Sequence, residues 1–144
     1  GALTIGTLDG ANIEIMERVG RENIVIFGLT ADEVAAQRSH GYNPRAIIEG
    51  SRELRQAVEA IGSGVFSPDD PGRYRGLMDG LYNSDWFMVA ADFESYSAAQ
   101  RSVDQRWRDV AGWQATVLRN IANVGWFSSD RTITDYAREI WGVL

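Results

Sequence analysis

The sequence predicts an α/β fold that is rich in helices and has an incomplete parallel sheet. Two short apolar segments, residues 3–7 and 23–28, have the composition of strands. Each is followed by a helical pattern, and this alternation is typical of a parallel sheet. After residue 41 the strand signals stop, and helical patterns continue to the end of the chain. Two parallel strands do not form a stable sheet alone, because parallel sheets are normally covered on both faces. We therefore expect further strands upstream of the first residue. The expected single partial domain has three parts, residues 1–40, 41–128 and 129–144.

The first strand is expected over residues 3–7 and leads into a tight turn. Asp9 is the candidate N-cap of a helix over residues 10–19, and Gly20 is a suitable C-terminal stop. The expected apolar stripe of this helix has three members, Ile13, Met16 and Val19.

The second strand, over residues 23–28, is a short apolar run that ends at a glycine, which is typical of a buried parallel strand. Thr30 is expected to cap the helix that follows. Glu33 lies at the capping-box spacing from it.

The middle of the chain is predicted to be mostly helical. Residues 43–64 form either one helix with a kink near Gly50 or two helices. Residues 67–85 open with a proline-rich turn and continue as a helix. Residues 86–91 are either a short strand or an extended segment, and the next helix is expected to begin at Asp92 or Phe93.

Three further helices are predicted, over residues 94–109, 112–125 and 130–141. Ser128, Ser129 or Asp130 would cap the last one. In the first, the apolar positions include Tyr96, Val103 and Trp107. In the second, one face carries Trp113, Val117 and Ile121. The last follows the i, i+3, i+4, i+7, i+8 pattern with Ile133, Tyr136, Ala137, Ile140 and Trp141.

Composition excludes several classes of site. The net charge of −6 argues against a general nucleic-acid binder, which would carry a basic surface. The chain has no Cys and no apolar run near the ~20 residues of a membrane span, so we expect a cytoplasmic protein without disulfides. All fourteen basic residues are Arg, so this chain cannot form a Schiff base.

His40 is the only histidine, and a Ser-His-Asp triad would have to use it. It follows Ser39 at the end of a predicted helix, where the helix dipole favours a histidine without any catalytic role. We therefore expect His40 not to be catalytic.

Carboxylates are plentiful, but their spacing favours solvated surfaces. A glycosidase needs two that face each other across a cleft. One pair lies at helical neighbour spacing and another lies in a proline turn. The pairs are Glu14 with Glu17, Asp69 with Asp70, and Asp130 with Asp135. With one His and no Cys, a metal site is not indicated either.

The segment GTLDGAN, residues 6–12, resembles a phosphate loop only weakly. A helix N-terminus attracts anions, but Asp9 would compete with a phosphate there, and no phosphate-loop motif is present. The alternative is a tight strand-to-helix connection in which Gly6 and Gly10 allow close packing.

The aromatic residues could stack on sugars, but most lie at apolar helix positions. Trp107, Trp113 and Trp141 are therefore expected to pack in a core or a domain interface. Trp126 and Phe127 lie in a connection, and both interpretations stay open for them.

Four strings resemble the C-terminal end of the α-glucan phosphorylases (glycogen, starch and maltodextrin phosphorylases). They are GALTIGTLDGANIEI, NIVIFG, LRQAVEAIGSGVFSPDDP and VLRNIANVGWFSSDRTITDYAREIWGV. The resemblance extends from Gly1 to Val143 and is weakest near residues 40–60 and 85–110.

The resemblance implies a C-terminal fragment of a two-domain, GT-B type glycosyltransferase built from Rossmann-like domains. Such enzymes transfer glucose from the non-reducing end of α-1,4-glucans to phosphate and give glucose 1-phosphate. Their pyridoxal phosphate is bound to a lysine upstream of the segment that matches this chain, and its phosphate group acts in proton transfer. No catalytic, cofactor or metal residue carries over to this chain. Residues 4–12 would buttress the lysine segment, and the helix over residues 130–141 would pack against the N-terminal domain.

The resemblance thus predicts a fragment that is inactive alone, with the remainder of the parent polypeptide as its partner and α-1,4-glucan and phosphate as the parent's substrates. A non-catalytic binding or scaffolding module derived from that domain is the alternative. A sugar-nucleotide transferase domain is a third possibility, against which the SSDRTITDYAREIWG ending argues. Apolar surface left without its partner is expected to make the isolated fragment self-associate.

Overall fold

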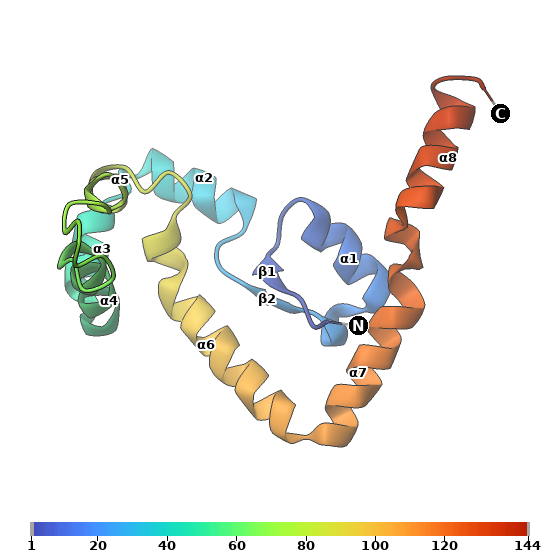
Figure 1. Ribbon diagram of the computed structural model, residues 1–144, viewed down its shortest axis with the longest axis horizontal. Helices are drawn as coiled ribbons and strands as arrows, with labels where there is room; N and C mark the ends of the chain where they lie inside the picture. Colours follow the sequence, from blue (N-terminus) through green and yellow to red (C-terminus); the bar gives the residue numbers. More distant parts are fainter. Residues whose placement is uncertain (1, 144) are drawn as a thin grey trace. The chain divides into compact units, whose positions relative to one another are not determined.

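The computed structural model describes residues 2–143, and residues 1 and 144, the ends of the expected domain, lie outside the described residues. The strands and the first helices alternate, and helices follow to the end (Figure 1). The elements are β1 (Ile5–Thr7), α1 (Ala11–Val19), η1 (Arg21–Asn23), β2 (Val25–Phe27), α2 (Ala31–Ser39), α3 (Pro44–Gly50), α4 (Arg52–Gly62), α5 (Arg75–Asn83), α6 (Val89–Arg108), α7 (Val110–Asn123), η2 (Val124–Phe127) and α8 (Ser129–Glu139).

The chain forms two compact units. The first unit comprises Gly1–Ile26 and Ala99–Leu144, and the second comprises Phe27–Ala98. The chain passes from one unit to the other within β2 and within α6.

The first unit contains β1, α1 and α7. β1 and β2 form a two-stranded parallel sheet, as expected. The Val25 amide donates to the Thr4 carbonyl oxygen at 2.9 Å. Val19, Ile24 and Val25 are buried beside this pair. The predicted strand–helix–strand start is therefore confirmed, although both strands are shorter than expected.

The start of α1 differs from the prediction. Gly10, with φ 47°, is the N-cap residue and provides no side chain, so the proposed capping role of Asp9 is wrong. The Asp9 carboxylate instead accepts a hydrogen bond from the Thr7 hydroxyl at 3.0 Å, which holds it in the turn. The predicted stop at Gly20 is confirmed, with φ 88°. Of the predicted stripe only Val19 is buried.

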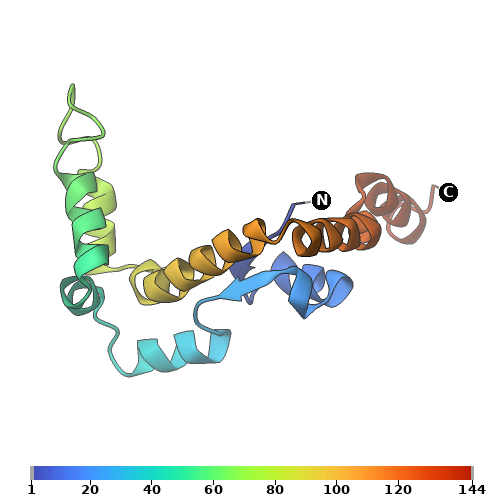
Figure 2. The same cartoon turned by 90° about the horizontal axis from the view of Figure 1, so that it is seen from below.

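The second unit has its core among α3, α4, α5 and the start of α6, with α3, α4 and α5 packed together (Figure 2). The core residues are Ile48, Leu54, Val58 and Ala90. The two-helix alternative for residues 43–64 is confirmed, because the chain breaks at Ser51, whose hydroxyl caps α4.

The predicted capping box of α2 is confirmed. The Thr30 side chain accepts from the Glu33 amide, and the Glu33 carboxylate accepts from the Thr30 amide. The hydrogen bonds from the Thr30 backbone and hydroxyl hold the pKa of Glu33 below its usual value.

Residues 84–88 form neither a strand nor a simple extended segment. Asp85 and Met88 have left-handed backbone conformations, with φ 35° and 57°, and α6 begins at Val89, earlier than predicted. The early start has a local cause, because the Asp85 carboxylate accepts hydrogen bonds from the first amides of the helix.

The faces of α7 and α8 also differ from simple apolar stripes. In α7, Ile121 is 56% exposed, whereas Asn120 is buried and its side chain donates to the Asn23 carbonyl oxygen at 3.0 Å. In α8, whose N-cap is Ser128, only Ala137 of the predicted stripe is buried. The last two stripe residues, Ile140 and Trp141, lie beyond the end of this helix. Most of the apolar stripe of α8 is therefore exposed among the described residues.

Candidate functional site

His40 has no arrangement suited to a triad among residues 2–143. It is exposed at the C-terminus of α2, and its Nδ1 lies 2.7 Å from the Ala36 carbonyl oxygen. The neighbouring Ser39 hydroxyl donates to the same carbonyl. Glu33 lines the same surface hollow, but its carboxylate is engaged by Thr30. The structure therefore places His40 as a helix-terminal residue.

The predicted carboxylate pairs lie on exposed surfaces. Glu14 and Glu17 are both exposed on α1. Asp69 and Asp70 lie 3.0 and 3.9 Å from the Arg73 guanidinium. In α8, Asp135 pairs with Arg131 at 2.6 Å and Asp130 is exposed. Within the described part of the chain, no group of three His, Cys, Asp or Glu side chains could hold a metal ion.

The β1–α1 turn is a packed connection. The Asn12 side chain donates to the Thr7 carbonyl oxygen at 2.9 Å, and it occupies the space that a side chain at position 6 would need. Gly6 therefore allows this close approach, as the packing alternative predicts. For Gly10 that alternative is wrong, because a Cβ added there would meet no other atom within 4 Å. Because the Asp9 carboxylate lies in the same turn, its charge opposes an anion at the start of α1.

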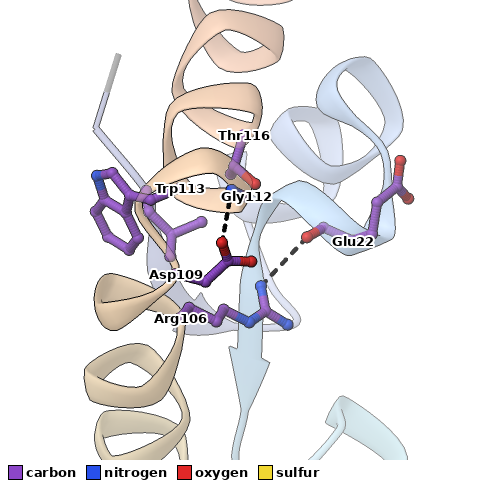
Figure 3. A pocket seen from close by; sticks show the side chains of 7 residues that line it. Glu22, Arg106, Asp109, Gly112, Trp113 and Thr116 are labelled. Carbon is purple, nitrogen blue, oxygen red and sulfur yellow. Dashed lines mark hydrogen bonds between the residues drawn. The ribbon is translucent and has the colours of Figure 1, made fainter.

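A pocket of about 180 Å³ lies in the first unit, where the end of α6 meets the start of α7 (Figure 3). Arg106 donates to the Glu22 carbonyl oxygen at 3.2 Å, and the Asp109 carboxylate accepts from the Gly112 amide at 3.1 Å. The Glu22 carboxylate points away from Arg106 (Figure 3). These polar groups thus fix the α6–α7 corner, and they include no nucleophile with an adjacent base. The lining residues are Leu3, Glu22, Arg106, Asp109, Gly112, Trp113 and Thr116.

Trp126, left open by the sequence, is a packing residue. The guanidinium carbons of Arg18 and Arg131 each lie 3.7 Å from its ring centroid. Two cations cannot share one face at that distance, so both faces of the ring are covered. The Arg131 Nε also donates to the Trp126 carbonyl oxygen at 2.6 Å. This cluster of Arg18, Trp126 and Arg131 ties α1 to η2 and α8.

The other candidate tryptophans are not core residues of this chain. Trp107 is exposed and makes an edge-to-face contact with Trp113, with ring centroids 4.9 Å apart. Trp141 is also exposed and contacts Tyr136 in the same manner at 5.9 Å. The core interpretation is therefore wrong for Trp107 and Trp141, and the interface interpretation stays a prediction.

A buried carboxylate with several hydrogen bonds lies in the second unit, in the loop of residues 84–88. Asp85 is 4% exposed and accepts three hydrogen bonds, from the Tyr42 hydroxyl at 2.6 Å and from the amides of Val89 and Ala90 at 2.9 and 2.8 Å. Burial, followed by the hydrogen bond and the charge of Asp85, raises the pKa of Tyr42 well above its usual value.

This loop borders a second cavity, of about 290 Å³. Trp86 lies at the edge of this cavity and is 67% exposed. The Arg38 guanidinium carbon lies 4.4 Å from the centroid of the Trp86 ring. The sequence pattern did not identify Trp86 or Asp85 as site residues. The only signal was the failure of residues 86–91 to fit either a strand or a helix. The lining residues are Arg38, Gly41, Tyr42, Ser84, Asp85, Trp86 and Met88.

The fold defines the class of protein first: a helix-rich α/β protein with a two-stranded sheet among residues 2–143. Comparison with known proteins then gives the family. The family model of the carbohydrate phosphorylases matches residues 1–143, so the chain belongs to that family.

Individual relatives agree with this assignment. The brain forms of glycogen phosphorylase from Mus musculus and Homo sapiens are each 52% identical over 143 residues. The glycogen phosphorylase of Pasteurella multocida is 48% identical over 143 residues. Each match covers 99% of this chain but only 17–18% of the relative, so the chain spans less than a fifth of the length of these proteins.

Proposed function

We propose that this chain is a C-terminal segment of an α-glucan phosphorylase, which transfers glucose from the non-reducing end of an α-1,4-glucan to phosphate and releases glucose 1-phosphate. The observation that carries the proposal is the match to glycogen phosphorylases over almost the whole chain, together with the small share of those relatives that it covers. The segment alone is expected to be inactive.

The residues of this chain do not fit the family's pyridoxal phosphate as a covalent cofactor. A Schiff base needs a lysine amine, and the chain contains none. A lysine elsewhere in the parent polypeptide would have to hold the cofactor. We expect residues 4–12 to support that lysine's segment, because the hydrogen bonds of Asn12 and Asp9 make the β1–α1 turn a fixed connection.

The remainder of the parent polypeptide is the expected partner. A two-stranded sheet needs further strands, and a GT-B arrangement of two Rossmann-like domains would supply them. The apolar face of α8 and the residues just after it is exposed at Ile133, Tyr136, Ile140 and Trp141. In the parent enzyme this face would be covered by the N-terminal domain.

The same exposed surfaces lead to an expectation for the isolated chain. Contiguous apolar patches favour association in water. The isolated segment is therefore expected to self-associate, and a single sharp monomer in light scattering at high concentration would contradict this.

None of the helices over residues 2–143 has the length and apolar character to cross a membrane. We expect the parent enzyme to be cytoplasmic.

Phosphorolysis tests the proposal directly. The whole gene product that carries this segment is purified and given glycogen and inorganic phosphate, and glucose 1-phosphate is measured. The 144-residue chain with added pyridoxal phosphate is the matched control. We expect product that depends on phosphate from the whole gene product and none from the control. A whole gene product without phosphorolysis would favour the alternative, a non-catalytic binding module derived from the same domain.

A further inference from the structure

We propose that the free edge of β1 pairs with a further β-strand from the part of the parent polypeptide outside residues 2–143, and that β2 stays at the edge of the sheet. The inference rests on the proposed function for its partner, because a longer parent polypeptide has to supply the strand.

The hydrogen bond between the two strands shows which edge of β1 is free. The Val25 amide donates to the Thr4 carbonyl oxygen, so the backbone of residue 4 points toward β2. Successive residues of a strand point their backbone groups toward opposite edges. The amide and the carbonyl of Ile5 therefore point away from β2. The sheet among the described residues contains only β1 and β2, so Ile5 has no strand on that side.

The composition of β1 is that of an inner strand. Edge strands of natural proteins usually carry a charge or a proline, because unpaired N–H and C=O groups are a template for pairing with another chain. Residues 3–7 contain neither a charge nor a proline, and Ile5 is half-buried. Pairing the free edge of β1 with another strand satisfies these groups.

The outer edge of β2 already has hydrogen-bond partners from α6. Gly28, which by the same alternation points away from β1, donates its amide hydrogen to the Ser95 hydroxyl at 3.0 Å in the second unit. In the first unit, Arg106 donates to the Glu22 carbonyl oxygen at 3.2 Å, just before the strand. A strand beside β2 would have to displace these bonds, whereas a strand beside β1 meets the unpaired groups of Ile5.

The remainder of the parent polypeptide suits this edge better than a second copy of the chain does. The chain spans less than a fifth of the length of the relatives that it matches. A parallel strand needs a crossover connection of about a dozen residues or more, which such a remainder can supply. Pairing of two copies through β1 would involve only Ile5–Thr7 and would also cost the entropy of association.

Hydrogen exchange of the whole gene product, resolved to single residues by fragmentation in the mass spectrometer, tests the proposal. We expect the amide of Ile5 to exchange as slowly as that of Val25, within a factor of about ten. Ile26 points to the outer edge of β2, and its amide should exchange at least about a hundredfold faster than both.

A pair of variants tests the same edge. Ile5→Pro removes the amide, and Ile5→Ala is the matched control that shortens the side chain but keeps the amide. Proline is tolerated at the free edge of a sheet but not in an inner strand. We expect exchange across β1 and β2 to be at least about tenfold faster in Ile5→Pro than in Ile5→Ala. Failure of Ile5→Pro alone to fold would support the proposal equally.

Three outcomes would overturn the proposal. They are an Ile5 amide that exchanges as fast as the Ile26 amide, equal exchange in the two variants, and protection of Ile5 that disappears on dilution to the monomer. The last outcome would assign the edge to a second copy.

Phosphorolysis by the wild-type protein separates these results from the proposed function. If the whole gene product phosphorolyses glycogen and the Ile5 amide is unprotected, only the strand pairing is refuted. If the Ile5 amide is protected and phosphorolysis is absent, only the proposed function is refuted.

Discussion

Replacing the buried Asp85 with alanine should open the start of α6. The carboxylate is the shared acceptor for the Tyr42 hydroxyl and for the amides of Val89 and Ala90. After the substitution these donors lose their partner in a largely buried site, because Asp85 is 4% exposed. We expect the segment that begins at Val89 to exchange its amide hydrogens much faster.

The size of this destabilisation follows from the loss of the three hydrogen bonds and from the backbone conformation of Asp85. Each bond to a charged acceptor contributes about 1.5–3 kcal/mol, and coupled losses add up to less than their sum. Asp85 also sits at φ 35°, where Ala lacks the local tolerance of Asp and Asn and costs about 1 kcal/mol more. We therefore expect Asp85→Ala to lower the free energy of local opening by about 4 kcal/mol. Asp85→Asn should cost about 2 kcal/mol, because the amide oxygen can keep the two bonds at the Oδ2 position.

Hydrogen exchange measured by mass spectrometry on the whole gene product can detect this change. A loss of about 4 kcal/mol corresponds to about a thousandfold faster exchange in peptides that cover residues 89–98, at 1.36 kcal/mol per factor of ten. Asp79→Ala, at an exposed position on α5, is the control and should leave exchange unchanged within a factor of about two. If Asp85→Ala accelerates exchange by less than tenfold, the capping role assigned to Asp85 is incorrect.

Three further predictions test other contacts. Burial and Asp85 raise the pKa of Tyr42 in the folded chain, so the protonated hydroxyl stabilises the fold. This contribution to the free energy of unfolding is complete below about pH 10, and it is lost as the pH rises above the pKa of Tyr42 in the unfolded chain. Tyr42→Phe should therefore flatten the fall in urea midpoint between about pH 10 and 12, and an equal fall in both proteins would contradict the assignment. Gly6→Ala places a methyl group against the Asn12 side chain and should cost about 1–3 kcal/mol in urea unfolding, whereas an unchanged midpoint would show that the turn has room. Trp126→Ala removes the ring between two guanidinium groups and should lower the local stability of α8 by about 1–2 kcal/mol. Hydrogen exchange in α8 should then become faster, and unchanged exchange would contradict the packing role of Trp126.

The features that sequence analysis predicted correctly depend on neighbours in the chain. The capping box joins Thr30 to Glu33, and the stop at Gly20 needs only the conformational freedom of glycine. The break between α3 and α4 likewise coincides with a serine that can cap the next helix. Such signals involve residues three or four positions apart, so they are readable from the sequence alone.

The features that the prediction missed depend on distant partners. Asp85 is ordered by Tyr42, which lies 43 positions earlier in the chain. The buried face of α7 includes Asn120 because its side chain bonds to Asn23, 97 positions away. An apolar count cannot find a polar residue that is buried by such a bond, and it favoured the exposed Ile121 instead. The conformation of the loop over residues 84–88 was missed for the same reason, since the hydrogen bonds of Asp85 hold it.

The apolar stripe of α8 shows a different limit. The periodicity predicted an amphipathic helix, and the structure contains a helix over Ser129–Glu139. Yet most of the stripe is exposed among the described residues. Amphipathic periodicity reports that a face needs a partner, but it does not say whether that partner belongs to the same chain segment.

One measurement tests the central claim most directly. An antibody against residues 130–144 captures the native polypeptide from its cell, and both the size of the captured polypeptide and its phosphate-dependent release of glucose 1-phosphate from glycogen are measured. Since this 16.0 kDa chain covers 17% of its relatives, the account predicts a polypeptide several times larger that performs phosphorolysis. A captured polypeptide of about the chain's own mass, without phosphorolysis, would contradict the account and favour a non-catalytic module.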